Sequence, residues 1–217
     1  MTKNKIIGLI ALIIILGGGF YYFYLRSARN QENLSSPSTE RSGVTGTGDF
    51  EVKAVPTASQ FPPPPDLNRP ILITLSLPDE TKKLATDKIN DLSAKLKKDP
   101  ALFDHWLELG RFRKMIGDNE GARQAWEYAG LISPSNYVSF NNLGELYGYY
   151  LKDLAKAEAN YKKAVSNGPD QIYLYRNFAD FYRFVLKDTA KAKTILEKGI
   201  KANPGTSEDL QNLLKQI

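Results

Sequence analysis

The sequence contains no cysteine and a single histidine among its 217 residues. The missing thiols exclude disulfides, iron–sulfur clusters, thiolate zinc sites, cysteine nucleophiles and the acylated cysteine of a bacterial lipoprotein. His105, which adjoins Trp106, has no second histidine with which to bind a metal ion and no triad partner. No phosphate-binding loop, nucleophile elbow or HExxH motif is present. We therefore expect no catalytic, cofactor or metal site, and we predict that the protein is not an enzyme.

Long runs of basic residues are also missing, although the formal net charge is +5. From Asp79 to the end, the sequence has 22 Lys and Arg against 19 Asp and Glu, spread along the chain. Nucleic-acid binding would need basic residues gathered on one face with aromatic residues between them. The charge pattern therefore predicts a mixed, solvated surface and no nucleic-acid partner.

One long apolar run is present, at residues 6–25, which read IIGLIALIIILGGGFYYFYL without a charge. At about 1.5 Å per residue, a helix of this length spans roughly 30 Å, the thickness of the hydrocarbon core of a bilayer. The aromatic cluster at its end, followed by Arg26 and Arg29, is typical of a membrane interface. A cleavable signal peptide is the alternative, but no A-x-A-like cleavage site follows. We predict an uncleaved, single-pass transmembrane anchor.

The charges on either side of this anchor bear on its orientation in the membrane. The tail, residues 1–5, carries two lysines, which the arginines on the other side of the anchor nearly balance. Because so short an N-terminal tail usually stays in the cytoplasm, we expect the rest of the chain to be extracytoplasmic.

Two further segments precede the helical part of the chain. Residues 26–70 are rich in Ser, Thr, Gly and Pro, and bury too little apolar surface to offset their chain entropy. They predict a disordered tether. Residues 71–78, which begin ILITLSL, are apolar and β-branched and indicate an extended segment. Because a lone strand is not stable, we expect this segment to pack against the domain that follows.

From Asp79 onward the pattern is helical, and it repeats. Residues 151–169 and 186–204 are identical at eight of nineteen positions. Prolines at 100, 134, 169 and 204 are spaced by 34, 35 and 35 residues. Repetition at a fixed period indicates helical units that stack, because each unit leaves an apolar face for its neighbour to cover.

Aligned on these prolines, the copies place large and small residues in the same slots. The first copy has Trp106, Leu109, Gly110, Ala122, Trp126, Ala129 and Pro134. The second has Phe140, Leu143, Gly144, Tyr147, Ala157, Tyr161, Ala164 and Pro169, and the third has Tyr175, Phe178, Ala179, Tyr182, Ala192, Leu196, Gly199 and Pro204. This order resembles the tetratricopeptide repeat (TPR), W-x₂-L-G-x₂-Y followed by A-x₃-F and P. Arg113 departs from it, because the pattern has tyrosine there.

The resemblance implies an all-α fold: a TPR-type α-solenoid of about three helix-pair repeats with flanking helices, preceded by one N-terminal transmembrane helix. The predicted units are a helix at 79–100, repeats at 101–134, 135–169 and 170–204, and a capping helix at 205–217. We expect the paired helices to cross closely where Gly110 faces Ala122 and Gly144 faces Ala157. The extra residue of the second and third repeats is expected as a longer turn between the two helices.

The resemblance also implies that the first helices of the repeats line a concave groove for an extended peptide or a helix of another protein. The candidate partner-binding residues in the groove are Arg111, Lys114, Asn141, Asn142, Glu145, Tyr149, Tyr173, Arg176, Asn177, Asp180 and Arg183. The members of the family that bind chaperone tails use a Lys/Asn/Arg clamp for a carboxylate. Leu107 and Arg111 stand where that clamp would have its first Lys and Asn, so we do not expect this class of partner.

These expectations describe a non-enzymatic, membrane-tethered scaffold that binds a protein or peptide partner and assists envelope assembly or secretion. The first alternative is an anchored receptor or co-chaperone that faces the cytosol. The second is self-association into a homo-oligomer through the ends of the solenoid. As a third hypothesis, residues 71–77 fill the groove of their own chain.

Overall fold

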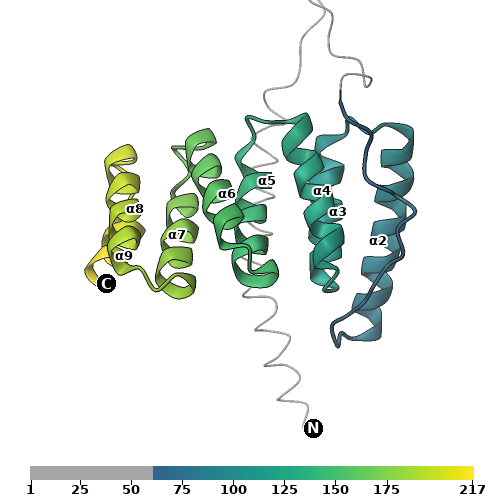
Figure 1. Cartoon of the computed structure of the whole chain (residues 1–217), viewed down its shortest axis with the longest axis horizontal. Helices are drawn as coiled ribbons and strands as arrows, with labels where there is room; N and C mark the ends of the chain where they lie inside the picture. The colour runs from purple at the N-terminus through teal and green to yellow at the C-terminus, as the bar shows by residue number, and fades with distance from the viewer. Residues whose placement is uncertain (1–60) are drawn as a thin grey trace, which may run out of the picture. The chain divides into compact units, whose positions relative to one another are not determined.

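The computed structural model describes residues 61–217, and all regular structure in this part is helical (Figure 1). The prediction of an all-α fold is therefore confirmed for this part. The predicted tail, anchor and first part of the tether, residues 1–60, lie outside the described residues. The α-helices are α2 (Asp79–Lys98), α3 (Phe103–Met115), α4 (Asn119–Ile132), α5 (Tyr137–Glu145), α6 (Leu154–Asn167), α7 (Ile172–Asp180), α8 (Thr189–Ala202) and α9 (Glu208–Lys215). Two π-helical segments, η2 (Leu146–Leu151) and η3 (Phe181–Val185), directly continue α5 and α7.

Each second helix of a pair begins at an aspartate that recurs every 35 residues. Asp118, Asp153 and Asp188 precede α4, α6 and α8, and each side chain accepts a hydrogen bond from the backbone amide three residues later. Such N-caps satisfy amides that have no partner within the helix. Each of these helices ends two residues before a proline of the series, which has no amide with which to continue the helix.

The extra residue of the second and third repeats lies in the first helix, and the prediction of a longer turn is wrong. Hydrogen bonds in a π-helix run from residue i to i+5, so one turn takes up one more residue. The Leu186 amide, for example, donates to the Phe181 carbonyl. The turns that follow are alike in all three repeats, because Gly117, Lys152 and Lys187, each next to a capping aspartate, have φ of 85°, 60° and 57°.

Gly110 and Gly144 make room for aromatic rings of the second helices. A Cβ atom on Gly110 would lie 2.5 Å from Cδ1 of Trp126, and one on Gly144 would lie 2.8 Å from Cδ1 of Tyr161. We expected Ala122 and Ala157 as the facing residues, and this expectation needs correction. Helical side chains lean toward the N-terminus, so a ring one turn later covers the space beside the alanine.

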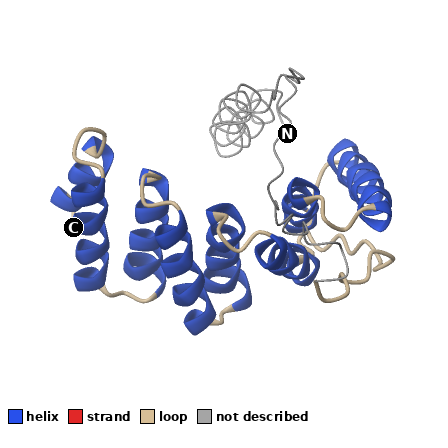
Figure 2. Ribbon diagram, turned by 90° about the horizontal axis from the view of Figure 1, so that it is seen from above, coloured by secondary structure: helices blue, strands red, loops and turns tan. Residues whose placement is uncertain are grey.

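The helix pairs stack side by side. Figure 1 shows α3 with α4, α5 with α6 and α7 with α8 as successive hairpins, and Figure 2 shows the same helices from above as a curved row. The first helices are neighbours, because α5 contacts α7 and an ion pair joins α3 to α5. We call the surface formed by α3, α5–η2 and α7–η3 the first-helix face.

Residues 61–78 form an extended segment without regular secondary structure, which we call the strap. At one end, the Pro62 carbonyl accepts a hydrogen bond from the Tyr128 hydroxyl of α4. Further on, the Thr74 amide donates to the Ile116 carbonyl at the end of α3, over 2.9 Å. Three strap side chains pack on the core between α2, α3 and α4: Leu67, Ile71 and Leu77. The predicted extended segment therefore lies against the helical domain, as expected.

Arg69 fixes the middle of the strap. Its Nη2 lies 2.8 Å from Oδ1 of Asp118, and Nη1 of Arg113 lies 2.6 Å from Oδ2 of the same carboxylate. Arg113 also donates to the carbonyls of Arg69 and Pro70. Residues 61–70, which we assigned to the disordered tether, belong to the strap because these contacts hold them. Arg113, the residue that departs from the repeat pattern, is thus the residue on which the strap docks.

The strap lies away from the predicted groove. Its hydrogen bonds to the helical part reach α2, the end of α3, Asp118 and α4, and in residues 61–217 they involve none of the eleven candidate groove residues. This position argues against the hypothesis that residues 71–77 fill the groove.

Candidate functional site

Side chains of the first-helix face pair across neighbouring helices. Nζ of Lys114 on α3 lies 2.7 Å from Oε1 of Glu145 on α5, and 4.6 Å from the ring centroid of Tyr150 on η2. Burial alone would lower the pKa of Lys114, but Glu145 and Tyr150 more than compensate and raise it above its usual value. Two of the predicted groove residues are thus brought together, in a half-buried ion pair that links the first two repeats.

The amides of the face form a second link. Nδ2 of Asn177 on α7 donates to Oδ1 of Asn141 on α5 over 3.1 Å, and Asn141 is only 2% exposed. Asn142 is half-buried beside it on α5. Tyr173 and Tyr137 meet edge to face with their ring centroids 6.4 Å apart. Asn141 therefore has a structural contact, while Asn142 and Asn177 keep polar atoms at the surface of the face.

A cavity of about 240 Å³ opens between α5–η2, α6 and α7. Four predicted groove residues meet there, and two further tyrosines complete the lining: Glu145, Tyr149, Asn177, Asp180, Tyr150 and Tyr161. Sequence reasoning missed both tyrosines. Tyr161 was assigned to a core slot, and its aromatic character gave no signal that the hydroxyl reaches a cavity. Tyr150 lies within the π-helical segment η2, whose extra residue changes the direction of the side chains along it.

Asp180 stands out among the groups that line this cavity. It is half-buried on α7, and its carboxylate has no hydrogen bond or ion pair within residues 61–217. Burial raises the pKa of Asp180 above its usual value, although the charges of Arg176 and Arg183 partly offset this effect. Burial, followed by the charges of Asp180 and Glu145, raises the pKa of Tyr149 to about 12. Of the two carboxylates in the lining, Glu145 is thus paired with Lys114, whereas Asp180 has no ion pair within residues 61–217.

The remaining candidates lie at the edges of the face. Arg111 is exposed, stacks over the Phe112 ring and lies 3.4 Å from Glu108. Arg176 is exposed on α7. Arg183 lies over the ring of Phe184, with the guanidinium carbon 4.8 Å from its centroid. None of these three cations lines the cavity.

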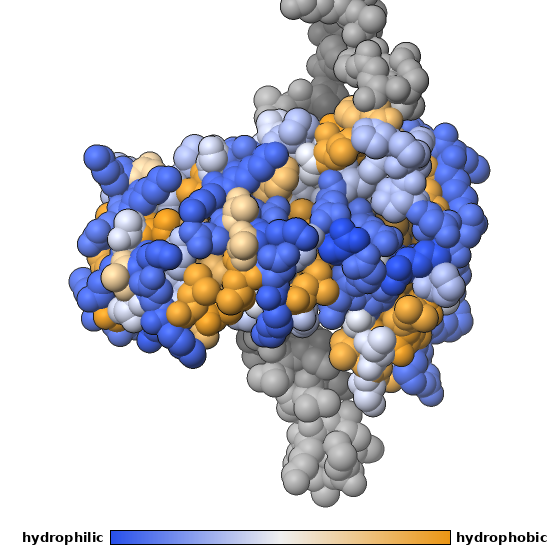
Figure 3. Space-filling view, viewed as in Figure 1, coloured by the Kyte–Doolittle hydropathy of each residue, from blue (hydrophilic) through white to orange (hydrophobic). Residues whose placement is uncertain are grey.

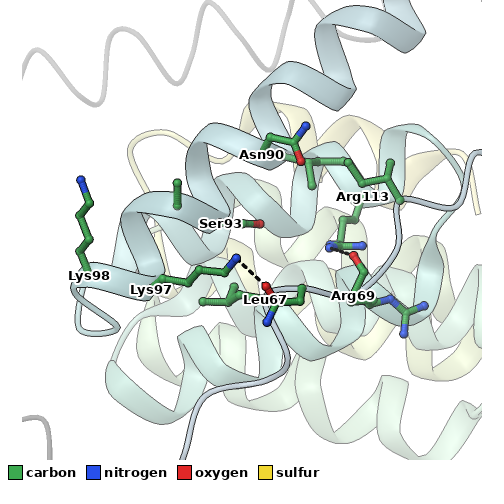
Figure 4. A pocket seen from close by; sticks show the side chains of 11 residues that line it. Leu67, Arg69, Asn90, Ser93, Lys97, Lys98 and Arg113 are labelled. Atoms are coloured by element: carbon green, nitrogen blue, oxygen red, sulfur yellow. Dashed lines mark hydrogen bonds between the residues drawn. The ribbon is translucent and has the colours of Figure 1, made fainter.

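A second cavity, of about 510 Å³, lies between the strap and α2 (Figure 4). Its charged lining residues are all cations: Arg69, Lys97, Lys98 and Arg113. Most of its polar groups already have partners, because Asp118 holds both arginines and Lys97 donates to Asn68 over 2.7 Å. The hydroxyl of Ser93, though, has none within the described residues. We interpret this cavity as the seam along which the strap meets α2.

The face of the described residues that is visible in Figure 3 is mostly hydrophilic, with separate apolar areas. The large apolar side chains that remain exposed include Leu72 and Leu75 of the strap, Tyr150 of η2 and Phe184 of η3. Within residues 61–217, no helix is both long and apolar enough to cross a membrane, and the predicted anchor at 6–25 lies outside this part. Nor does this part contain a group of three or more His, Cys, Asp or Glu side chains that could hold a metal ion.

Comparison with known proteins bears on the repeats. Residues 137–170, which comprise α5, η2 and α6, match a family model described as tetratricopeptide repeat. No curated protein matches the sequence. Among solved structures, the chain is similar to the crystal structure of MamA, at 18% sequence identity and a TM-score of 0.48, over 65% of this chain and 90% of that one. The segment formed by α5, η2 and α6 is therefore similar to a tetratricopeptide repeat.

Proposed function

We propose that the first-helix face binds an extended peptide or a helix of a protein partner, and that residues 6–25 tether this binding domain to a membrane. The observation that carries the proposal is the cavity at which Glu145, Tyr149, Asn177 and Asp180 meet. These side chains come from two consecutive repeats, so a ligand that contacts all of them spans the junction between the repeats. Buried polar groups normally have partners, and groups without one favour a ligand that supplies it.

The second helices differ from this face in a way that supports the proposal. Their charged side chains pair along their own helices, three or four residues apart. These pairs are Arg123 with Glu120 and Glu127 on α4, Lys162 with Glu158 on α6, and Lys156 and Lys191 with the capping aspartates of α6 and α8. Such local pairs stabilise the helices that carry them, and Glu127 and Glu158 also accept hydrogen bonds from Tyr147 and Tyr182. On the first-helix face, Lys114 pairs with Glu145 of the next repeat, Arg111 pairs with Glu108 within α3, and Asp180 has no ion pair within residues 61–217.

The membrane setting follows from the sequence alone. The apolar segment at residues 6–25 and the Ser/Pro-rich tether after it suit a domain held near a membrane while it reaches a partner. We propose an extracytoplasmic domain that assists envelope assembly or secretion, as a non-enzymatic scaffold. An anchored cytosolic receptor and a self-associating homo-oligomer remain the two competing functions, and the experiments below separate them.

Site-specific photo-crosslinking in cells tests the binding face. A photoreactive phenylalanine derivative would replace Asn142 or Arg176 in the full-length chain, with Lys162 and Lys198, exposed on α6 and α8, as matched control positions. We expect adducts with another protein from the first two positions only. An adduct at twice the mass of the chain would instead identify self-association. Equal adducts from all four positions, or none, would contradict the proposal.

Thiol labelling tests the membrane orientation, and the absence of native cysteine makes it clean. The variant Ser38→Cys places one thiol in the tether. We expect a membrane-impermeant maleimide to label it in intact cells. Protection until lysis would overturn the extracytoplasmic orientation and favour the cytosolic receptor.

A further inference from the structure

We propose that the cavity between η2, α6 and α7 binds the guanidinium group of an arginine side chain, with Asp180 as its counter-ion and the surrounding tyrosines as its walls. This inference rests on the proposed function, because it names the chemical group that the partner presents to the first-helix face.

The size and position of the cavity suit one side chain. The cavity has a volume of about 240 Å³ and opens on the first-helix face between the second and third repeats. An extended peptide that follows this face can therefore keep its backbone outside and insert a single long side chain. The lining offers two carboxylates, three tyrosines and one amide, and no cation: Glu145, Asp180, Tyr149, Tyr150, Tyr161 and Asn177.

The charge of the cavity selects a cation. Asp180 has no hydrogen-bond or ion-pair partner within the described residues, and Arg176 and Arg183 act on it only through their charges. A desolvated carboxylate without a partner is unfavourable, and a bound cation would remove that penalty. Negative charge focused in a small concave site also attracts cations from solution.

Tyr161 gives a second, independent indication. The side chain is 1% exposed, lines the cavity, and its hydroxyl makes no hydrogen bond within residues 61–217. Burial, followed by the charges of Glu145, Tyr149 and Asp180, raises the pKa of Tyr161, so its hydroxyl stays neutral. A neutral hydroxyl in the lining of the cavity has lone pairs free to accept a hydrogen bond from a ligand. The ligand should therefore carry several N–H donors.

The chain itself already binds a cation between a carboxylate and an aromatic ring next to the cavity. Lys114 places its ammonium group 2.7 Å from Glu145 and over the Tyr150 ring, so a carboxylate and an aromatic ring of this lining already hold a cation together. Asp180 and Tyr149 offer the same pair of groups without a cation. Arginine suits them better than lysine, because its planar guanidinium can bond a carboxylate through two parallel N–H groups and stack on a tyrosine ring.

An NMR titration of the full-length chain in detergent micelles tests the inference. The probes are N-acetyl-arginine amide and N-acetyl-citrulline amide, which have nearly the same shape but differ in charge. We expect the arginine probe to shift the signals of Tyr149, Asn177 and Asp180 in a saturable way, and the citrulline probe to leave them unchanged. Asp180→Asn should weaken binding of the arginine probe by about tenfold or more, because it removes the counter-ion of a half-buried cation. Glu197→Gln, at an exposed acid on α8, is the matched control and should bind as the wild type does.

The outcomes are distinct. Equal binding of the two probes, unchanged binding by Asp180→Asn, or shifts confined to other parts of the chain would overturn the arginine site. The crosslinks from Asn142 and Arg176 report on partner binding independently. Crosslinks without an arginine site would leave the proposed function standing and reject only this inference. An arginine site without crosslinks would leave this inference standing and reject the proposed function.

Discussion

Arg113 and Asp118 form an ion pair in which Nη1 lies 2.6 Å from Oδ2 and the two side chains are 3% and 2% exposed. The same aspartate caps α4 and accepts Arg69 from the strap, so one carboxylate joins a helix end, a repeat and a segment 49 residues away in sequence. In the other two repeats, within residues 61–217, the capping aspartates form ion pairs only with their own helices. The first repeat therefore offers an experiment with its own internal controls.

Asp118→Asn should be strongly destabilising, and Asp153→Asn should not. Asparagine caps a helix about as well as aspartate, so the cap itself is kept in both variants. Only Asp118→Asn leaves a buried guanidinium without its counter-ion, a change that typically costs about 3–5 kcal/mol. We expect urea unfolding of the full-length chain, followed by circular dichroism, to show this loss for Asp118→Asn and a change within about 0.5 kcal/mol for Asp153→Asn. Equal effects would mean that the strap adds nothing to the stability of the first repeat.

The advantage of the wild type over Asp118→Asn should also depend on pH. Burial alone would raise the pKa of Asp118, but hydrogen bonds from Arg69, the Gly121 amide and Arg113 together hold it below its usual value of 3.8. A carboxyl group whose pKa is lower in the folded than in the unfolded state stabilises the fold above the unfolded pKa, and loses this effect as the pH falls through the folded pKa. The difference in free energy of unfolding between the two proteins should be constant from pH 7 to about 5 and shrink below about pH 4. A difference that grows on acidification would contradict this assignment.

Gly117→Ala should release the strap. A Cβ atom there would clash with Oγ1 of Thr74 and lie 2.9 Å from Cγ of Leu75, and φ is +85°. Lys152 and Lys187 occupy the same left-handed position in repeats that no described part of the strap touches. Native-state hydrogen exchange is the measurement, because the Thr74 amide donates to the Ile116 carbonyl. We expect Gly117→Ala to abolish its protection while the amides of α4 stay protected.

Lys152→Gly is the counterpart in the second repeat. The left-handed conformation costs a residue with a Cβ about 1–2 kcal/mol, and glycine avoids this cost but adds entropy to the unfolded chain. We therefore expect a gain of up to about 1 kcal/mol in the free energy of unfolding. A loss of stability would show that Lys152 makes contacts that outweigh its backbone conformation.

The periodic features of the fold were predictable because they follow from residue type and spacing. The prolines and the large and small slots placed every helix pair within residues 79–204, and the face position of Asp180 followed from the same register. The strap contacts were not predictable, since they depend on single residues such as Arg69, far from their partners in sequence. The π-helical turns were also missed. An extra residue has no chemical signature, and only packing decides whether it enters a turn or a helix. This local change brings Tyr150 to the cavity.

The close contact between Gly110 and the ring of Trp126 gives a further test of the packing within a repeat. Gly110→Ala should destabilise the first repeat by about 1–3 kcal/mol, because the new Cβ meets the ring of Trp126. The third repeat carries Ala179 and Leu196 in the two equivalent slots. The double variant Gly110→Ala, Trp126→Leu should therefore be more stable than the sum of the two single changes predicts. A double-mutant cycle by urea unfolding measures this coupling, and strict additivity would show that the two positions do not interact.

Asp180→Asn should stabilise the fold at neutral pH, the reverse of the effect at Asp118. Burial raises the pKa of Asp180 above 3.8, so the folded state holds this proton more tightly than the unfolded chain does. The penalty is absent below the unfolded pKa, grows as the pH rises through the folded pKa, and is complete above it. We expect Asp180→Asn to be about 0.5–2 kcal/mol more stable than the wild type at pH 7, the range typical of residues kept for function at the expense of stability. The difference should vanish near pH 3, and Glu197→Gln should show no gain at either pH.

The same measurement links this stability difference to the proposed arginine site. A ligand that binds the folded state alone raises its stability according to its concentration and affinity. Adding N-acetyl-arginine amide should therefore stabilise the wild type more than Asp180→Asn, so that the difference in stability between them narrows. If Asp180→Asn proved less stable than the wild type at pH 7, the carboxylate would have a partner within the chain. In that case the negative charge of the cavity would serve the fold, and the argument for a ligand there would fail.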